Sequence, residues 1–273
     1  MNMKLSIITI NFNNLEGLKK TAESVINQTW KDFEWIIIDG GSTDGSKEYI
    51  INLNDNLNHN GWDLITYWCS EPDKGIYNAM NKGIAKASGE YLNFMNSGDC
   101  FYESGTLERV SVYLEEGVAD VYYGNTKYTF KGKENIQVIH SPLDIYDLYV
   151  AGLCHQSSFI KRSCLENNGY IETYKIVADY DKWLELAFGN KTFLHIDILV
   201  CEFDKTGISE TEPFLREKER ILATNKYYPE MLKLSMGRLF VREEGHLYKR
   251  LDAIINRGGL RSVIVRGILK ILD

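Results

Sequence analysis

Residues 5–26 read LSIITINFNNLEGLKKTAESVI and place two different periodicities side by side. The first six residues, LSIITI, are rich in β-branched side chains and predict a short buried strand. Asn13 and Asn14 follow it and suit the start of a helix. Apolar residues then recur at helical spacing, at Leu15, Leu18, Ala22, Val25 and Ile26. This stretch predicts a strand followed directly by a helix.

The same order recurs through the rest of the first half of the chain. Strands are expected over residues 33–39, 64–69 and 91–95, each an almost continuous apolar run. Helices are expected from 47 to 53, around Ile76, Met80 and Ile84, and around Leu107, Val110 and Leu114. Strands without polar alternation, joined by helices, indicate an α/β fold with a parallel sheet covered on both faces. Ligands of such sheets bind beyond the carboxyl ends of the strands.

The second half is less regular. A strand is expected over residues 121–130, a hairpin turn over 131–133 and a late strand over 193–203. Helices are expected over 159–165 and 181–188, and the chain is expected to be helical from Pro213 onward.

Composition limits the function. The chain has 273 residues, 44% hydrophobic and 25% charged, with a net charge of −7. This acidic balance makes nucleic acid an unlikely partner. The five cysteines stand singly, without the short spacing of a zinc or redox motif, which favours reduced core residues in a cytoplasmic protein. No run of the length of a signal-peptide core or spanning helix occurs.

Three polar loops follow the predicted strands. Residues 39–46 (DGGSTDGS) lack the Lys-Ser/Thr pair of a P-loop, so Asp39 is either part of a turn or an acceptor for a base N–H or a ribose hydroxyl. Asp73 follows the third strand and suits a helix cap. Asn96 and Asp99 follow the fourth strand, where a divalent cation and phosphates would sit. Further along, Asp179 is either an N-cap or a carboxylate base, and His155 is either a core residue or part of a site.

The series of motifs in this order resembles the family 2 glycosyltransferases of the GT-A fold, which transfer a sugar from a nucleotide-sugar with inversion. Residues 6–14 (SIITINFNN), 38–46 (IDGGSTDGS), 79–84 (AMNKGI), 87–91 (ASGEY), 96–99 (NSGD) and 178–181 (ADYD) carry the resemblance. It covers about residues 4–210.

The resemblance implies roles for particular residues. Asp179 is expected to be the catalytic base, Asp99 to bind Mn²⁺ or Mg²⁺, and His155 and Asp181 to lie toward the acceptor or diphosphate. The nucleotide is expected to contact Thr9, Asn11, Phe12, Asp39, Ser42, Asp73 and Asn96. A UDP-sugar is favoured because Asp39 suits an imide N–H, and residues 204–209 are a candidate lid. The acceptor is expected to be a saccharide or a lipid-linked molecule in surface polysaccharide or glycolipid synthesis.

Two departures from the family pattern leave alternatives open. Asn96 and Gly98 replace carboxylates of the metal motif, and Ala178 replaces the acidic neighbour of the base. A nucleotide-sugar-binding protein without catalysis is therefore the alternative. A nucleotidyltransferase would need a basic loop near the first strand, yet residues 10–14 contain neither Arg nor Lys.

The expected organisation is a GT-A domain over residues 1–210, followed by a helical extension over 211–273. Its nucleotide-binding half covers about 1–100 and its acceptor half about 101–210. Residues 246–273 contain six basic and two acidic residues. An amphipathic helix after Gly259 would lie on an anionic membrane at the inner face, or pack on the protein or a partner subunit as a dimer contact.

Overall fold

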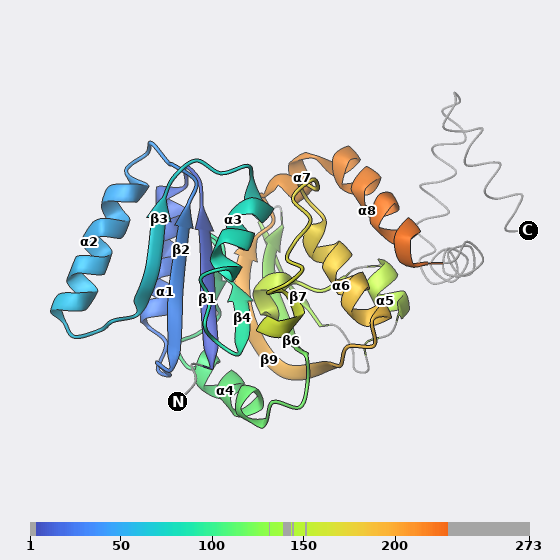
Figure 1. Cartoon of the computed structure of the whole chain (residues 1–273), viewed down its shortest axis with the longest axis horizontal. Coiled ribbons are helices and arrows are strands. Elements are labelled where there is room, and N and C mark those ends of the chain that lie inside the picture. The colour runs from blue at the N-terminus through green and yellow to red at the C-terminus, as the bar shows by residue number, and fades with distance from the viewer. Residues whose placement is uncertain (1–3, 131, 139–142, 144, 151, 229–273) are drawn as a thin grey trace, which may run out of the picture.

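The computed structural model describes residues 4–130, 132–138, 143, 145–150 and 152–228 (Figure 1). The predicted basic helix after Gly259, with its membrane or dimer contact, lies outside the described residues. The strands are β1 Leu5–Asn11, β2 Phe33–Asp39, β3 Ile65–Ser70, β4 Tyr91–Phe94, β5 Cys100–Phe101, β6 Val121–Phe130, β7 Lys133–Gln137, β8 Ser158–Lys161 and β9 Phe193–Asp204. The α-helices are α1 Leu15–Ile26, α2 Ser46–His59, α3 Ile76–Ile84, α4 Thr106–Glu116, α5 Ile145–Val150, α6 Ala178–Phe188, α7 Ile208–Thr211 and α8 Pro213–Tyr227. Two short 3₁₀ helices are η1 His155–Ser157 and η2 Arg162–Cys164.

One mixed sheet of nine strands runs through the described chain in the order β3-β2-β1-β4-β8-β6-β9-β5, with β7 paired to β6. Strands β3, β2, β1 and β4 are parallel, which confirms the predicted β-α units. Strand β8 is antiparallel to β4 and to β6, and β6 is parallel to β9. Strands β6 and β9 therefore run in the same direction as the first four, so the sheet is mostly parallel.

The helix predicted over residues 159–165 is wrong. Strand β8 and the short helix η2 occupy this stretch. Phe159 and Ile160 are fully buried because β8 lies between two other strands and has helices on both faces. A four-residue apolar run does not distinguish such a strand from a helix by periodicity.

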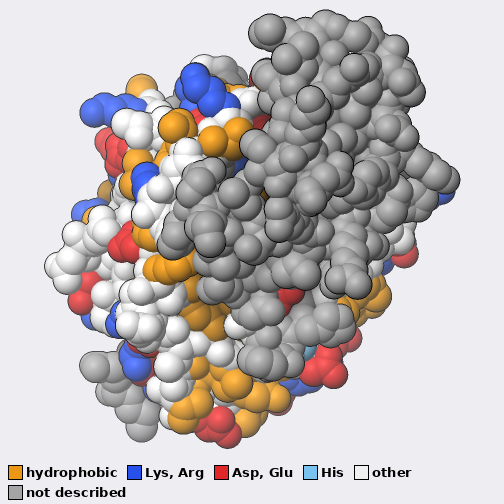
Figure 2. Space-filling model, turned by 90° about the vertical axis from the view of Figure 1, so that its right-hand side faces the viewer, with side chains coloured by type: hydrophobic (Ala, Val, Ile, Leu, Met, Phe, Trp, Pro, Cys, Tyr) orange, Lys and Arg blue, Asp and Glu red, His pale blue; other side chains and the backbone are white. Residues whose placement is uncertain are grey.

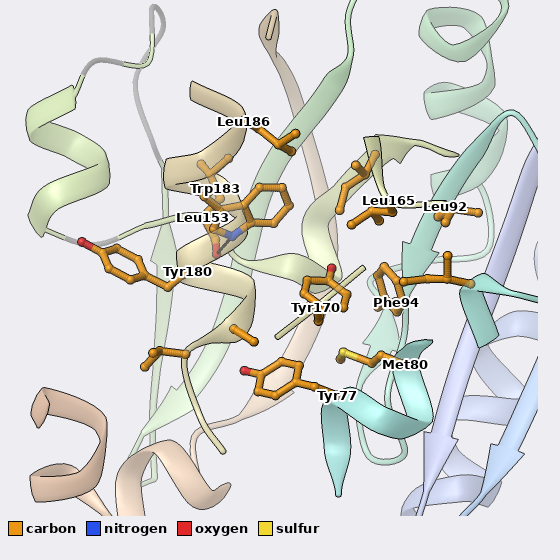
Figure 3. Close-up of a cluster of buried hydrophobic side chains, with 14 of the residues drawn as sticks. Tyr77, Met80, Leu92, Phe94, Leu153, Leu165, Tyr170, Tyr180, Trp183 and Leu186 are labelled. Carbon is orange, nitrogen blue, oxygen red and sulfur yellow. Dashed lines mark hydrogen bonds between the residues drawn. The ribbon is translucent and has the colours of Figure 1, made fainter. Parts of the chain in front are cut away.

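Helices cover both faces of the sheet, as predicted. Ile8 and Ile10 of β1 point to one face and pack with residues of α3, α6 and α8. Leu5 and Ile7 point to the other face and pack with α1, α2 and α4. Figure 3 shows the first of these clusters, in which the indole of Trp183 in α6 donates to the Leu153 carbonyl at 3.1 Å. The alternation of side chains along each strand thus produces two cores.

Helix α8 is packed into the same body as the preceding residues. Ala223 and Tyr228 are buried in the core beside α6. The Glu219 carboxylate accepts hydrogen bonds from the backbone N–H groups of Lys175 and Ile176, both at 2.9 Å. Helix α8 consequently holds in place the segment that leads into α6.

Among the described residues, no helix combines the length and apolarity that crossing a bilayer requires. The described part of the face in Figure 2 carries Lys and Arg side chains interspersed with acidic and apolar ones.

Candidate active site

A cleft of about 1060 Å³ lies at the carboxyl ends of β1, β2, β3 and β4. Its opposite border is formed by η1, by the first turn of α6, by Phe203 and Lys205, and by residues 207–210. The lining therefore includes residues from both halves of the predicted GT-A domain. The predicted lid residues Lys205, Gly207, Ile208 and Ser209 also line this cleft.

The junction of β1 and β2 is fixed by Asp39. Its carboxylate accepts hydrogen bonds from the Asn11 amide at 2.7 Å, from Ser42 and from the Ser70 hydroxyl at 2.6 Å. Burial acts to raise the pKa of Asp39, but these donors outweigh it and lower the pKa below its ordinary value. Asp39 is fully buried and, like Ser42, is not among the lining residues, whereas Asn11 is. Asp39 thus holds the floor of the cleft together.

An aromatic ring lies beside this junction. The Phe12 side chain lines the cleft and leaves 65% of its surface exposed. Gly40 passes so close that a Cβ there would lie 2.6 Å from the Asp73 carboxylate and 3.2 Å from the Phe12 ring. A side chain at Gly40 would press on both groups, so glycine keeps this wall of the cleft free, and the exposed Phe12 ring offers a flat face for a nucleobase.

Asp73 also lines the cleft, but it is not the helix cap that the sequence suggests. Helix α3 begins at Ile76 and its N-cap is Gly75, without a side-chain cap. The Asp73 carboxylate instead accepts a hydrogen bond from the Gly75 N–H at 2.8 Å. This bond fixes the turn before α3 and keeps the carboxylate at the edge of the cleft.

Asn96 and Asp99 come together beyond β4. Gln156 donates to one Asp99 oxygen at 2.9 Å, and burial raises the pKa of Asp99 to about 6. The Asn96 amide donates to His155 Nε2 at 3.1 Å, which leaves Asn96 Oδ1 buried without a partner.

The Asp99 carboxylate and the Asn96 amide oxygen are candidate ligands of a metal ion. Within the described ranges, no group of three or more His, Cys, Asp and Glu side chains can hold a metal ion. A carboxylate and an unpartnered amide oxygen nevertheless fit a hard divalent cation whose remaining ligands are diphosphate oxygens and water. The residues therefore fit a cation bound jointly with a nucleotide diphosphate.

The Asp179 carboxylate lies on the border of the cleft opposite β4, and each of its oxygens has a hydrogen-bond partner. Tyr77 donates its hydroxyl to one carboxylate oxygen at 3.1 Å, and His155 Nδ1 lies 3.1 Å from the other. Since His155 Nε2 accepts from Asn96, Nδ1 carries the proton that is shared with Asp179. Burial acts to lower the pKa of His155, but Asp179 outweighs it and raises the pKa above 6.5. Burial, and then the charge of Asp179, raise the pKa of Tyr77 well above 10, so Tyr77 stays a donor.

The N-cap role considered for Asp179 is wrong. Val177 is the N-cap residue of α6, without a side-chain cap, and Asp179 lies inside the first turn. Its side chain lines the cleft and bonds to groups from α3 and η1.

Two residues expected at the site lie elsewhere. The Asp181 side chain is 2% exposed and forms an ion pair with Lys226 of α8 at 2.7 Å. Thr9 is fully buried and accepts a hydrogen bond from the Trp35 indole at 3.0 Å. Neither is among the lining residues, because Asp181 points to α8 and Thr9 faces the second core.

Sequence reasoning missed Tyr77 and Gln156. Tyr77 occurs among apolar residues at helical spacing and was therefore indistinguishable from core, although a buried tyrosine hydroxyl needs a partner. Gln156 follows His155 directly, and its role as donor to Asp99 depends on two distant segments meeting. Lys175 also lines the cleft and was not predicted, and Lys205 was predicted only as part of the candidate lid.

A mostly parallel sheet with a cleft at its carboxyl edge, bordered by acidic side chains on both sides, agrees with a nucleotide-sugar-dependent transferase of the GT-A type. The sequence profile described as "Glycosyl transferase family 2" matches residues 6–170. The chain belongs to this family of glycosyltransferases.

Individual proteins agree with this assignment. The chain is 34% identical over 217 residues to an uncharacterized glycosyltransferase of Mycobacterium tuberculosis, covering 77% of this chain and 78% of that protein. It is 29% identical over 211 residues to a PGL/p-HBAD biosynthesis glycosyltransferase of Mycobacterium bovis, covering 74% and 77%.

Two solved structures share the fold. S. aureus TarS 1-349 in complex with UDP has a TM-score of 0.66 at 17% identity, covering 94% of this chain and 76% of that one. The mannosyltransferase PcManGT from Pyrobaculum calidifontis, in complex with GDP-Man and Mn²⁺, has a TM-score of 0.66 at 16% identity, covering 100% and 81%.

Proposed function

We propose that this glycosyltransferase inverts the anomeric carbon in a single displacement, with Asp179 as the base. The observation that carries the proposal is the position of the Asp179 carboxylate. It lies in the cleft across from the β4 loop, held by Tyr77 and by His155. A carboxylate held on both oxygens keeps one orientation, which general base catalysis requires.

The donor is a nucleotide diphosphate sugar, and a UDP-sugar is favoured. The exposed ring of Phe12 supplies a face for the base, and Asn11 and Asp73 line the cleft beside it. The uracil imide N–H needs an acceptor, and the Asp73 carboxylate lines the cleft beside Gly40. Asp39 supports this wall of the cleft from behind, because its oxygens are already bonded within the protein.

A divalent cation, Mn²⁺ or Mg²⁺, would be held by Asp99 and by the buried amide oxygen of Asn96. When bound, it supplies positive charge that stabilises the leaving diphosphate. Gln156 orients Asp99 by its hydrogen bond. PcManGT, which shares the fold, is described with Mn²⁺.

The transfer step needs one proton acceptor. The acceptor hydroxyl loses its proton to Asp179 as its oxygen attacks the anomeric carbon, and the bond to the diphosphate breaks on the opposite side. Tyr77 and His155 keep the carboxylate aimed into the cleft throughout. Residues 205–209 border the cleft and would exclude water from the activated sugar.

The acceptor is a hydroxyl of a saccharide or of a lipid-linked molecule in surface polysaccharide or glycolipid synthesis, and transfer takes place at the cytoplasmic side of a membrane. The relative named for PGL/p-HBAD biosynthesis supports the glycolipid acceptor. Lys175, which is exposed and lines the cleft, is available to contact the acceptor.

A panel of UDP-, GDP- and dTDP-sugars tests the proposal. Release of nucleoside diphosphate is measured with and without Mn²⁺, for the native protein and for Asp179→Asn. The proposal expects turnover of at least one donor and its loss in the variant. Turnover that persists in Asp179→Asn would remove Asp179 as the base, and a protein that binds donors without turning over any would be a binding protein.

A further inference from the structure

Two of the five cysteines lie on either side of Ser157 in η1. Cys154 lies directly before η1, lines the cleft, and accepts a hydrogen bond from the Ser157 N–H at its carbonyl at 3.2 Å. Cys201 lies in β9, is fully buried, and its sulfur contacts the Ser157 hydroxyl at 3.1 Å. Strand pairing with β5 and β6 fixes the backbone of Cys201, whereas Cys154 lies outside helix and strand. The Cys154 thiol therefore borders the cleft, and the Cys201 thiol lies deeper in the protein.

The surroundings make the two thiols unequal. The neighbouring Cys201, and after it His155, hold the pKa of the Cys154 thiol below its ordinary value against the effect of burial. Burial raises the pKa of Cys201 well above 9. The thiolate is the reactive form of cysteine, so Cys154 is the member of the pair that reacts first.

We propose that Cys154 and Cys201 form an oxidation site at which a hydroperoxide joins them in a disulfide. Cys154 can be reached from the cleft, as a reactive thiol must be. The buried Cys201 lies on the inner side, where it can attack the sulfenic acid that forms on Cys154.

The chemistry balances with hydrogen peroxide as the oxidant. The Cys154 thiolate attacks one peroxide oxygen, the O–O bond breaks, and a sulfenic acid and hydroxide form. The Cys201 sulfur then attacks the Cys154 sulfur, the S–O bond breaks, and the Cys201 proton leaves with the hydroxide as water. The two sulfurs together lose two electrons and peroxide is reduced to two waters. A dithiol reductant reverses the reaction by exchange.

Oxidation has a consequence for the site. The Cys154 thiol contacts the Gln156 side-chain oxygen at 2.9 Å, and the same amide donates to Asp99. Moving the Cys154 sulfur toward Cys201 removes this contact, so the Gln156 amide that donates to Asp99 loses one of the two bonds that fix its orientation. Disturbing a group that orients a metal-binding carboxylate typically costs about 10-fold or more in metal affinity or activity.

The remaining cysteines provide controls. The Cys164 sulfur lies 4.0 Å from the Asp120 carboxylate, and the Cys100 sulfur contacts the Lys20 carbonyl. Neither Cys164 nor Cys69 borders the cleft. Cys164→Ala is thus a matched control that removes a buried thiol without touching the pair.

The experiment treats the reduced full-length protein with one to a few equivalents of hydrogen peroxide and measures intact mass and the peptides of a non-reducing digest. We expect a mass lower by about 2 Da, reversed by dithiothreitol, and a peptide that links Cys154 to Cys201. The mass shift should persist in Cys164→Ala and disappear in Cys201→Ala. Cys154→Ala, which should also lack the shift, replaces Cys201→Ala if that variant does not fold.

Turnover of the donor is measured on the same samples as the mass. In the native protein, oxidation should lower turnover of the donor about 10-fold or more, and dithiothreitol should restore it. In Cys201→Ala, which retains turnover, the reversible loss should be absent. The proposal is overturned by oxygen addition on Cys154 without a linkage, by a disulfide between other cysteines, or by five thiols that all remain alkylatable. The mass and peptide results do not depend on the proposed transfer reaction, so the two proposals fail separately.

Discussion

Replacing Asp179 by Asn separates catalysis from stability at the centre of the proposed site. An asparagine at 179 keeps an oxygen for the Tyr77 hydroxyl and for the Tyr180 N–H, which lies 2.9 Å from the native carboxylate. Its amide replaces the second oxygen next to His155, whose Nδ1 then accepts, so the ring proton moves to Nε2 and the Asn96 amide turns its oxygen toward it. The positions of the side chains are retained, and the proton-accepting carboxylate is lost.

The two expected effects differ in size. Exchanging one charged hydrogen bond for a neutral one costs about 1 kcal/mol of unfolding free energy, or about 3 °C in Tm for a domain of this size. Loss of a general base costs about 100-fold or more in kcat, which corresponds to about 2.7 kcal/mol in the activation free energy.

Asp181→Asn is the matched control, two residues along the same helix. Its carboxylate is buried and pairs with Lys226, which is partly exposed, so its replacement costs about 2 kcal/mol of stability after allowance for screening. Activity per folded molecule should stay within about twofold, because Asp181 is absent from the cleft lining.

The assay measures nucleoside diphosphate release at saturating donor, together with a thermal melt of each variant. We expect low turnover with a near-native Tm for Asp179→Asn, and the reverse for Asp181→Asn. Near-native turnover in Asp179→Asn would refute the assignment of the base. A large loss of Tm with preserved specific activity would show that Asp179 has a structural role instead.

Three further changes test the donor side. Asp99→Asn should abolish Mn²⁺-dependent turnover with the far-UV circular dichroism unchanged, whereas near-native activity would contradict the metal assignment. Because burial raises the pKa of Asp99 from 3.8 to about 6, its protonated form is favoured by folding, and its contribution to stability falls as pH rises from about 4 to 6. The ionised form binds the cation, so kcat/KM should fall as pH drops below about 6; a flat profile there would argue against Asp99. Phe12→Ala should raise the donor KM about 10-fold by loss of base stacking, with kcat little changed, and an equal KM would place the base elsewhere.

The first half of the fold is predictable from sequence because each β-α unit carries its own signal. Buried parallel strands are continuous apolar runs, and amphipathic helices follow them; the first helix also carries a side-chain cap, since Asn14 accepts from the Gly17 N–H at 3.1 Å. Strand β8 is not predictable in this way. Its four residues are buried by partners that come from distant parts of the chain.

The site is predictable to the extent that strand ends meet at one edge of a sheet. Asn11, Asp73, Asn96 and Asp99 lie in the cleft for this reason, and Asp179 and His155 join them across it. Asp181 does not, because residues two apart on a helix point in different directions. The hydrogen bonds that orient the carboxylates, from Tyr77 and Gln156, depend on tertiary contacts that no local pattern encodes.

The central claim is inverting transfer from a nucleotide diphosphate sugar, and the stereochemistry of donor turnover tests it most directly. Proton NMR would follow the first sugar anomer released when water replaces the acceptor, with α-linked UDP-, GDP- and dTDP-sugars as donors. A single in-line displacement predicts that the β-anomer appears first and equilibrates later. Release of the α-anomer first, or no turnover of any donor, would contradict the account.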